Sequence, residues 1–260
     1  MNIILTGGTS NIGKLLVYKL RQHGYQVFEI GRNQHNYWQL GFPIPDPVKG
    51  EILIHLAHDR SRNVEESISD TKALLNGYSG FPIFLSSTSA HSNSYSNYGK
   101  SKFCAEQIFI EKSGAVIKAG LICGPVKNRF LEAITKKLRT YRCVILPYRG
   151  LSRFFISDAD ALVSEIILIA QTKRVGKIRG FSLMPTSFRN LLVKANCDLK
   201  FAILTIPFKK FSNLLIRTIH VLLPLNETAD SLLSLVSEIE LLEITSLQSP
   251  VNEFNLPLKL

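Results

Sequence analysis

The N-terminus constrains the fold more than any other part of the chain, because it combines a short apolar strand, a turn of small residues, a helix and a second strand. The first strand is expected at residues 2–6, and the helix at residues 11–23 is stopped by Gly24. The second strand is expected at residues 26–31. Two strands joined by a helix form a βαβ unit, which predicts a parallel sheet with right-handed crossovers.

The turn Thr6–Gly13 has the character of a phosphate site. Backbone N–H groups and the helix dipole attract a pyrophosphate to a helix N-terminus. Gly7 permits the tight turn, and Gly13 permits close packing of the helix on the sheet or on a cofactor. An acidic residue after the second strand would bind the ribose of NAD, whereas Arg32 suits the 2′-phosphate of NADP. An exposed loop arginine without a ligand is the alternative for Arg32.

Alternating strands and helices continue beyond this unit. Further strands are expected at residues 52–57, 82–87 and 115–120, and further helices at residues 64–76, 97–113 and 127–140. The strands are continuous apolar runs, as in a parallel sheet that is covered on both faces. The sequence therefore predicts an α/β fold, a Rossmann-type doubly wound parallel sheet with a small C-terminal substrate-binding lobe.

The expected division of the chain gives residues 1–123 mainly to the Rossmann core and residues 124–260 mainly to the lobe, with some elements interleaved. The elements expected in the lobe are strands at residues 144–146, 154–157 and 180–183, and helices at residues 158–171 and 228–242.

The pair Tyr98 and Lys102 is the main candidate for chemistry. Residues four apart on a helix share one face, so the ammonium of Lys102 can lie beside the phenol of Tyr98. A nearby positive charge favours the ionised form of a phenol, whose unperturbed pKa is about 10. Such a tyrosine can donate or accept a proton near neutral pH. A helix-surface role is the alternative for both residues.

A strand end rich in hydroxyl groups, Ser86-Ser87-Thr88, precedes this helix. The hydroxyl of Thr88 or Ser87 can hold a substrate oxygen within reach of the phenol. Capping of its own backbone is the alternative for Thr88. His55, inside an expected strand, is interpreted as a core histidine rather than a catalyst.

Together these motifs resemble the extended short-chain dehydrogenase/reductase superfamily, in its NAD(P)-dependent epimerase/dehydratase branch, over about residues 1–170. Six motifs in the right order are a stronger signal than any one of them. The segments that carry the resemblance are Thr6–Gly13, Ile54–Ala57, Ser86–Thr88, Tyr98–Lys102, Ala119–Pro125 and Arg153–Asp160.

The resemblance implies a role for each matching residue. The implied catalytic residues are Thr88, Tyr98 and Lys102. The implied cofactor-binding residues are Thr6, Gly7, Thr9, Ser10, Asn11, Ile12, Gly13, Arg32, Leu56, Ala57, Ser86, Tyr98, Lys102, Ala119, Gly120 and Leu121. The implied substrate-binding residues are Ser87, Thr88, Arg129 and Arg153, and pairing with Asp158 or Asp160 is the alternative for Arg153.

Three departures from the family pattern accompany the resemblance. Ser10 replaces the usual middle glycine, and its hydroxyl can bond the phosphate. The segment Ser89–Asn97 is shorter than in most extended members, which makes dehydration the least expected reaction. Compression between Asn33 and Glu51 leaves the third strand and its helix missing or vestigial.

Composition and charge narrow the function classes. No apolar run of about 18 residues lacks charge, so no membrane span is expected. The four cysteines form no C-x-x-C pair, which argues against a disulfide framework or a metal site and fits a reducing cytoplasm. Net charge is +11, and six basic residues gather between Lys127 and Arg142. This segment has three interpretations: a solvated helix face, a positive rim that attracts anionic ligands, or a nucleic-acid site. It lacks the interleaved aromatic residues that would favour nucleic acid. Residues 202–225 are a core helix rather than a membrane-surface helix.

The resemblance implies an NADP-dependent oxidoreductase or epimerase that acts on a nucleotide-linked sugar, by 4-keto reduction or epimerisation, in surface-polysaccharide synthesis. NAD is the less favoured cofactor. A homodimer through the helices at residues 64–76 and 97–112 is also implied. The alternative is a catalytically silent NADP-binding regulatory or scaffold protein.

Overall fold

The computed structural model describes residues 1–46, 48–94, 96–126, 132, 143–146, 153–182, 185–187, 189–190 and 202–205, with the backbone alone for residues 143–146, 153 and 202–205. Arg129, most of the basic segment and the helices expected at residues 127–140 and 228–242 lie outside these residues. So does the segment 206–225; residues 202–205, where the expected core helix would begin, form a strand instead. No helix within the described ranges is both long and apolar enough to cross a bilayer.

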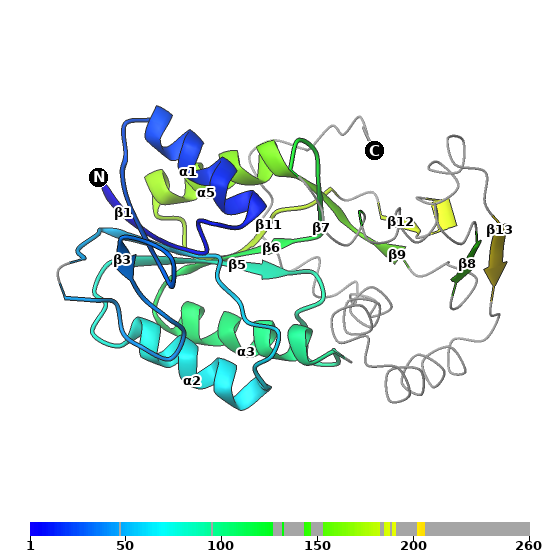
Figure 1. Cartoon of the computed structure of the whole chain (residues 1–260), viewed down its shortest axis with the longest axis horizontal. Helices are drawn as coiled ribbons and strands as arrows, with labels where there is room; N and C mark the ends of the chain where they lie inside the picture. Colours follow the sequence, from blue (N-terminus) through cyan, green and yellow to red (C-terminus); the bar gives the residue numbers. More distant parts are fainter. Residues whose placement is uncertain are drawn as a thin grey trace.

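Seven parallel strands form the central sheet, in the order β11-β6-β5-β4-β1-β2-β3 (Figure 1). The strands are β1 (Asn2–Thr6), β2 (Gln26–Gly31), β3 (Asn36–Tyr37), β4 (Ile52–His55), β5 (Phe81–Ser87), β6 (Ala115–Ala119) and β11 (Gly176–Arg179). The predicted Rossmann-type sheet is confirmed. The order reverses between β4 and β1, and parallel sheets bind ligands at such a switch point.

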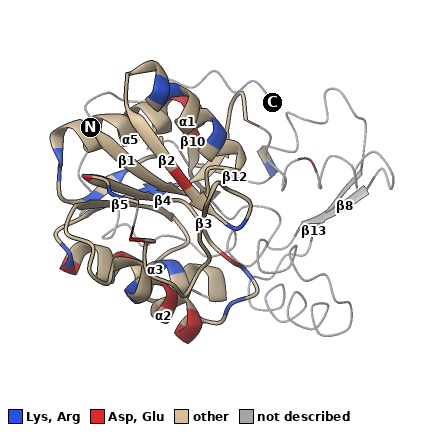
Figure 2. Cartoon of the chain, turned by 60° about the vertical axis from the view of Figure 1, so that its left-hand side comes forward, with Lys and Arg blue, Asp and Glu red and all other residues tan. Residues whose placement is uncertain are grey.

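Helices cover both faces of the sheet (Figure 1). The helices α1 (Asn11–Gln22) and α5 (Ala159–Thr172) cover one face, and α2 (Val64–Leu75) and α3 (Asn97–Glu111) cover the other. Side chains cap their first turns: Ser10, Ser96 and Asp158 each accept a backbone N–H, and Asn63 forms a capping box with Glu66. Acidic residues stand on α2 (Figure 2), where Glu65 and Glu66 complement the dipole of its first turn.

Two hydrophobic cores lie on the two faces, because successive side chains of a strand point in opposite directions. Ile3 and Leu5 of β1 join the core beneath α1 and α5. Ile4, between them, joins the core that contains Phe84 and Phe109. Consecutive apolar residues within a strand therefore serve opposite faces of the sheet, and such apolar runs identified the strands in the sequence.

The compressed segment after β2 retains only a vestige of the third strand, the two residues of β3. The described residues between β3 and β4 form no helix. Trp38 instead fills the edge of the second core, with a side chain that is 4% exposed and donates from Nε1 to the Phe42 carbonyl at 2.9 Å.

The structure corrects two placements in the C-terminal half. The helix expected at residues 158–171 packs on α1 and the central sheet, so α5 belongs to the core rather than to the lobe. The strand expected at residues 180–183 lies four residues earlier as β11 and pairs with β6. The apolar character of Gly180-Phe181 was misleading, because Phe181 is buried against Phe155 after the strand has ended.

The strand expected at residues 154–157 divides into two. They are β9 (Arg153–Phe154), antiparallel to β12 (Thr186–Ser187), and β10 (Ile156–Asp158), parallel to β7 (Leu121–Cys123). Farther from the sheet, β8 (Cys143–Leu146) pairs in parallel with β13 (Ala202–Thr205) (Figure 1).

Candidate functional site

A cleft of about 900 Å³ opens at the carboxyl ends of β1, β2, β4, β5 and β6. The turn after β1, the loop after β4, the end of β5 and the first turn of α3 line it, so segments far apart in the sequence converge there. Most of the expected site residues line it: Gly7, Thr9, Ser10, Asn11, Ile12, Arg32, Leu56, Ala57, Ser86, Ser87, Thr88, Tyr98, Lys102, Ala119, Gly120 and Leu121.

Four expected residues do not contribute side chains to the described cleft lining. Thr6 and Gly13 lie behind the turn. Arg153 is described by its backbone alone, although its neighbours Phe154 and Phe155 line the cleft. Arg129 lies outside the described residues.

The glycine-rich turn is a tight steric fit. Gly7 has φ +76°, and a Cβ there would lie 2.8 Å from the backbone nitrogen of Ala57. A Cβ on Gly13 would collide with the carbonyl oxygen of Gly7, so only glycine lets α1 sit this close to the turn. Gly13 therefore serves helix packing, and it is not among the residues that line the cleft.

Ser10 holds this turn together from the position of the usual middle glycine. Its hydroxyl donates to the Gly7 carbonyl at 2.8 Å and accepts the backbone N–H of Gly13 at 3.0 Å. The Ser10 side chain is thus the N-cap of α1, and the α1 N-terminus opens into the cleft. These features fit a pyrophosphate, because backbone N–H groups and the helix dipole at the N-terminus of α1 attract its negative charge.

Thr6 and His55 support the turn from below. The Thr6 hydroxyl oxygen accepts the Ala57 N–H at 3.2 Å and lies 2.7 Å from His55 Nδ1. The imidazole of His55 packs against the rings of Phe84 and Phe109, with centroids 5.7 and 5.9 Å away, and burial lowers the pKa of His55 to about 3. His55 is neutral and only 4% exposed, and its contacts with Thr6, Phe84 and Phe109 make it part of the core.

Charged side chains gather where β2 and β4 end. Arg32 is exposed there, and Arg62 lines the same cleft. Asp59 lies near both: hydrogen bonds from Ser61 hold the pKa of its carboxyl below the usual value, and the charges of Arg32 and Arg62 add to this. A carboxylate therefore accompanies the arginines at this end of the cleft.

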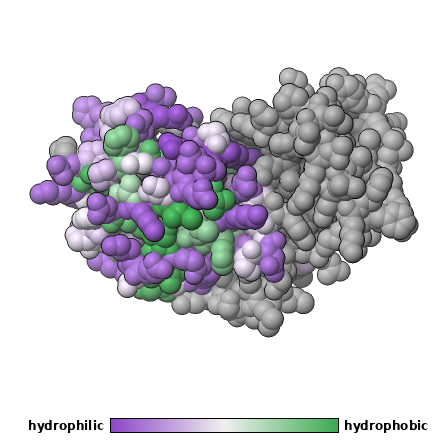
Figure 3. Space-filling model, turned by 90° about the horizontal axis from the view of Figure 1, so that it is seen from below, coloured by the Kyte–Doolittle hydropathy of each residue, from purple (hydrophilic) through white to green (hydrophobic). Residues whose placement is uncertain are grey.

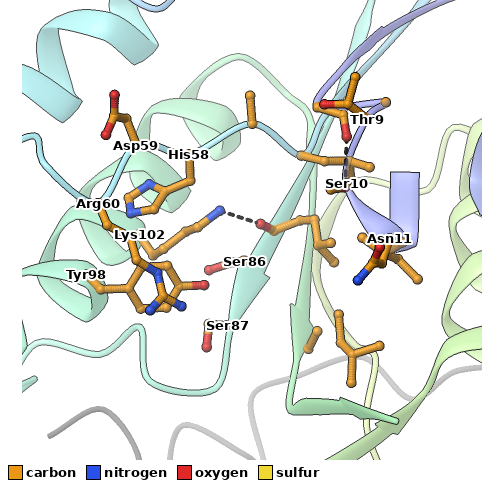
Figure 4. Close-up of a pocket in the computed structure, with 18 of the residues that line it drawn as sticks. Thr9, Ser10, Asn11, His58, Asp59, Arg60, Ser86, Ser87, Tyr98 and Lys102 are labelled. Carbon is orange, nitrogen blue, oxygen red and sulfur yellow. Dashed lines mark hydrogen bonds between the residues drawn. The ribbon is translucent and has the colours of Figure 1, made fainter. Parts of the chain in front are cut away.

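Tyr98 and Lys102 enter the cleft from the start of α3 (Figure 4). Lys102 is only 4% exposed, and its Nζ donates to the Leu85 carbonyl at 2.8 Å. The ammonium lies 4.4 Å from the Phe84 ring centroid and 6.0 Å from that of Tyr98. Burial lowers the pKa of Lys102 to about 7; the charge of Glu106 opposes this shift and the charge of Arg60 adds to it.

Glu106, one turn beyond Lys102, is fully buried among basic groups. Its carboxylate accepts from the Ser86 hydroxyl at 2.6 Å and lies 3.5 Å from Lys118 Nζ and 3.1 Å from Lys177 Nζ. The Ser86 hydroxyl is therefore used in holding β5 to α3. Ser86 can contribute to a cofactor site through its backbone.

Thr88 and Ser87 are half-buried at the end of β5 and face the cleft. The backbone N–H of Thr88 donates to the Ala119 carbonyl at 2.8 Å, which fixes the strand end beside β6. The Ser87 hydroxyl lies 2.9 Å from the Ser89 hydroxyl. On the other side, a Cβ on Gly120 would collide with the Phe155 carbonyl, so glycine brings β10 close to the cleft wall.

Sequence reasoning missed His58 and Arg60, which lie against Tyr98 (Figure 4). The His58 ring meets the phenol edge-on, with centroids 4.8 Å apart, and burial lowers the pKa of His58 to about 3. The guanidinium carbon of Arg60 lies 5.2 Å from the phenol centroid. Their position directly after β4, at the ligand-binding edge of a parallel sheet, was the available signal.

Comparisons with known proteins identify the fold. No protein-family model matches the sequence, and no curated protein matches it significantly. Among solved structures, a dTDP-4-dehydrorhamnose reductase from Yersinia enterocolitica is 18% identical, with a TM-score of 0.62 over 79% of this chain and 83% of its own. A UDP-glucose 4-epimerase from Thermotoga maritima, solved with UDP-glucose, is 20% identical, with a TM-score of 0.65 over 80% and 86%.

A third similar structure contains a cofactor. A dTDP-4-dehydrorhamnose reductase from Bacillus anthracis, in complex with NADP, is 15% identical, with a TM-score of 0.60 over 81% of this chain and 86% of its own. The chain thus has the fold of nucleotide-sugar reductases and epimerases.

Proposed function

We propose that the chain is a nicotinamide-dependent oxidoreductase or epimerase of the extended short-chain dehydrogenase/reductase family, acting on a nucleotide-linked sugar. The observation that carries the proposal is the meeting of two sites in one cleft. The glycine-rich turn opens into the cleft from β1, and Tyr98 and Lys102 enter it from α3. Ser87 and Thr88 add hydroxyl groups at the end of β5.

The cofactor would be held mainly by backbone. The turn from Gly7 to Ile12 and the α1 N-terminus suit the pyrophosphate, and Leu56, Ala57, Ala119, Gly120 and Leu121 form the walls farther along the cleft. A bound nicotinamide supplies or takes up a hydride.

The protein's own part in the chemistry is proton transfer at Tyr98 Oη. In the direction of reduction, the phenol donates its proton to the substrate oxygen; in the direction of oxidation, the tyrosinate takes it back. Thr88, with Ser87 beside it, orients the oxygen by a hydrogen bond. Lys102 supports the tyrosinate by its charge and can reach a ribose hydroxyl when its bond to Leu85 is exchanged.

NADP is the proposed cofactor because Arg32 stands at the end of β2, where the 2′-phosphate would lie. Arg62 adds a second cation at this end of the cleft. Asp59 offsets part of their charge, so the preference for NADP over NAD should be moderate.

A nucleotide-linked sugar suits the charge and shape of the cleft. Its described lining contains four cations, Arg32, Arg60, Arg62 and Lys102, against the single carboxylate of Asp59. Phe154 and Phe155 form an apolar wall beside β7. Arg153, next to this wall, and Arg129 remain proposed substrate-binding residues. A place in surface-polysaccharide synthesis is part of the proposal.

A homodimer through α2 and α3 is proposed as well. Seen from the side of these helices, hydrophobic residues gather in a patch (Figure 3). Light scattering at micromolar concentration tests it, and a monomer would contradict it.

The test of the function combines binding and turnover. The protein should bind NADPH and oxidise it with a 4-keto sugar nucleotide from a panel of UDP, dTDP and GDP sugars; interconversion of 4-epimers indicates the epimerase instead. Tyr98→Phe should keep NADPH binding and lower turnover by about two to four orders of magnitude, the contribution of a positioned acid–base group. NADPH binding without turnover on any sugar would favour the silent binding protein, and wild-type turnover in Tyr98→Phe would refute the role of Tyr98.

A further inference from the structure

Two cations flank the phenol of Tyr98, and the one that the sequence did not indicate is the closer. The guanidinium carbon of Arg60 lies 5.2 Å from the ring centroid, whereas Lys102 Nζ lies 6.0 Å away (Figure 4). Cations within about 6 Å of an aromatic centroid are attracted by the ring. A ring that carries the negative charge of a tyrosinate attracts them more strongly.

The two cations differ in how firmly they keep their charge. Lys102 is buried, donates to the Leu85 carbonyl, and has its pKa lowered to about 7. Arg60 is exposed at the rim, and an arginine stays protonated throughout the physiological range. Above neutral pH, Arg60 is therefore the more permanent positive charge beside the phenol.

Lys102 aside, no other charged or titratable group in the described lining of the cleft supplies the positive charge that Arg60 places beside the phenol. His58, on the same loop as Arg60, is held neutral by burial and meets the phenol by its ring edge. Asp59 is tied to Ser61, and Arg32 and Arg62 stand at the adenosine end. The residues that β5 contributes, Leu85 to Thr88, do not titrate.

We propose that Arg60 is a positioning residue for Tyr98. The guanidinium of Arg60 lies over the phenol of Tyr98 and stabilises the tyrosinate during proton transfer. The proposal rests on the proposed function. The step itself is a proton exchange: the O–H bond of the substrate breaks, the O–H bond of Tyr98 forms, and Arg60 stays protonated throughout. Arg60 acts on the charge of the tyrosinate and does not touch the reacting atoms.

The experiment follows the ionisation of Tyr98 directly, without substrate or cofactor. The protein is labelled with tyrosine carrying ¹³C at Cζ, and the eight tyrosine signals are titrated by NMR. Tyr98→Phe identifies the Tyr98 signal by its loss. In Arg60→Met the Tyr98 midpoint should rise by about 0.5 to 1 pH unit, as expected for an exposed unit charge several ångströms away. Because Arg60 is exposed, 1 M salt should shrink the difference.

Two variants separate charge from packing. Arg60→Lys keeps the charge and should retain much of the native midpoint. Arg21→Met removes an exposed arginine on α1, paired with Glu29, and should leave the Tyr98 midpoint unchanged. An unchanged midpoint in Arg60→Met, or equal shifts in Arg60→Met and Arg60→Lys, would overturn the proposal.

Failure of the proposed function gives a different result. If the wild-type protein turned over no sugar nucleotide, the proposed function would fail, whereas the Tyr98 midpoint would still report on Arg60. If turnover is found, the pH profile of kcat/KM for oxidation provides a second measure. Its acid limb should move to higher pH in Arg60→Met and stay in place in Arg21→Met, and a fixed limb in Arg60→Met would overturn the proposal.

Discussion

The β1–α1 side of the cleft is lined by a glycine-rich turn, whereas the β4–α2 loop and α3 contribute ionisable side chains to the other side. The first side is fixed by contacts among neighbours: Ser10 bonds to Gly7 and Gly13, all within one turn. The second side joins three distant segments, with Arg60 and His58 against Tyr98 and Lys102 against Leu85. Steric fit therefore governs the β1–α1 side, and burial of charge governs the side that contains Tyr98 and Lys102.

The largest effect should come from breaking the steric fit. Gly13→Val places side-chain atoms against the Gly7 carbonyl, so it should lower the free energy of unfolding by about 3 kcal/mol and abolish NADPH binding. Lys14→Val introduces the same side chain at the next, exposed position of α1 and should change stability by less than about 1 kcal/mol. Chemical denaturation measures both, and equal losses would show that the turn is not sterically restricted.

Burial of Lys102, on the other side of the cleft, should instead make the free energy of unfolding depend on pH. Lys102 has a pKa of about 7 in the folded protein and its ordinary value of 10.5 when unfolded, so the unfolded chain holds more protons between these values. The free energy of unfolding should therefore rise from pH 6 to pH 9, by about 2–3 kcal/mol from this group.

Lys102→Met should remove this rise, and Lys100→Met, at an exposed position of the same helix, should retain it. Urea denaturation at the two pH values measures the difference. A rise that persists in Lys102→Met would contradict a buried, weakly basic lysine.

A smaller change in the free energy of unfolding should appear at acidic pH, because of His55. His55 is neutral in the folded protein, with a pKa of about 3 against an ordinary 6.5, so the unfolded chain binds more protons below pH 6.5. Stability should fall as the pH is lowered, by about 2 kcal/mol from His55 at pH 5. The fall between pH 7 and pH 5 should shrink in His55→Gln and persist in His23→Gln, which alters an exposed histidine.

The smallest effect concerns cofactor choice. Arg32→Ala should reduce the preference for NADPH over NADH by about tenfold, because an exposed arginine loses a charge-assisted bond to the 2′-phosphate. Arg21→Ala should leave the ratio unchanged. Titration of both cofactors measures it, and equal affinities in the wild-type protein would refute the role of Arg32.

The sequence predicted the features that depend on neighbours along the chain. The first βαβ unit, the apolar strands and the spacing of Tyr98 and Lys102 follow from local patterns, and the structure has all of them. In the C-terminal half of the chain, position in the sequence did not predict whether an element belongs to the core or to the lobe. The α5 helix and β11 come after segments that lie away from the central sheet, yet both pack on that sheet. Their place in the core is evident only from these tertiary contacts.

The same reason explains which site features were missed. His58 and Arg60 follow β4, and their relation to Tyr98 arises only when β4 and β5 lie side by side. Ser10 and Ser86 were both predicted to bind a cofactor, and the structure adds that the hydroxyl group of each is bonded to protein partners. The residue type indicated which hydrogen bonds or charges each side chain can offer. The tertiary contacts determined which partner each side chain has in the folded protein.

The burial of Glu106 has a consequence for the order of folding. Its carboxylate faces Lys118 of β6 and Lys177 of β11, and β11 forms the edge of the sheet late in the chain. During synthesis α3 therefore emerges well before the last of its counter-charges, and long-range contacts of this kind form slowly. Until β11 docks, a nascent chain carries an incompletely compensated carboxylate on α3, the helix that also carries Tyr98 and Lys102. Completion of the sheet edge is thus linked to the final packing of the helix that carries Tyr98 and Lys102.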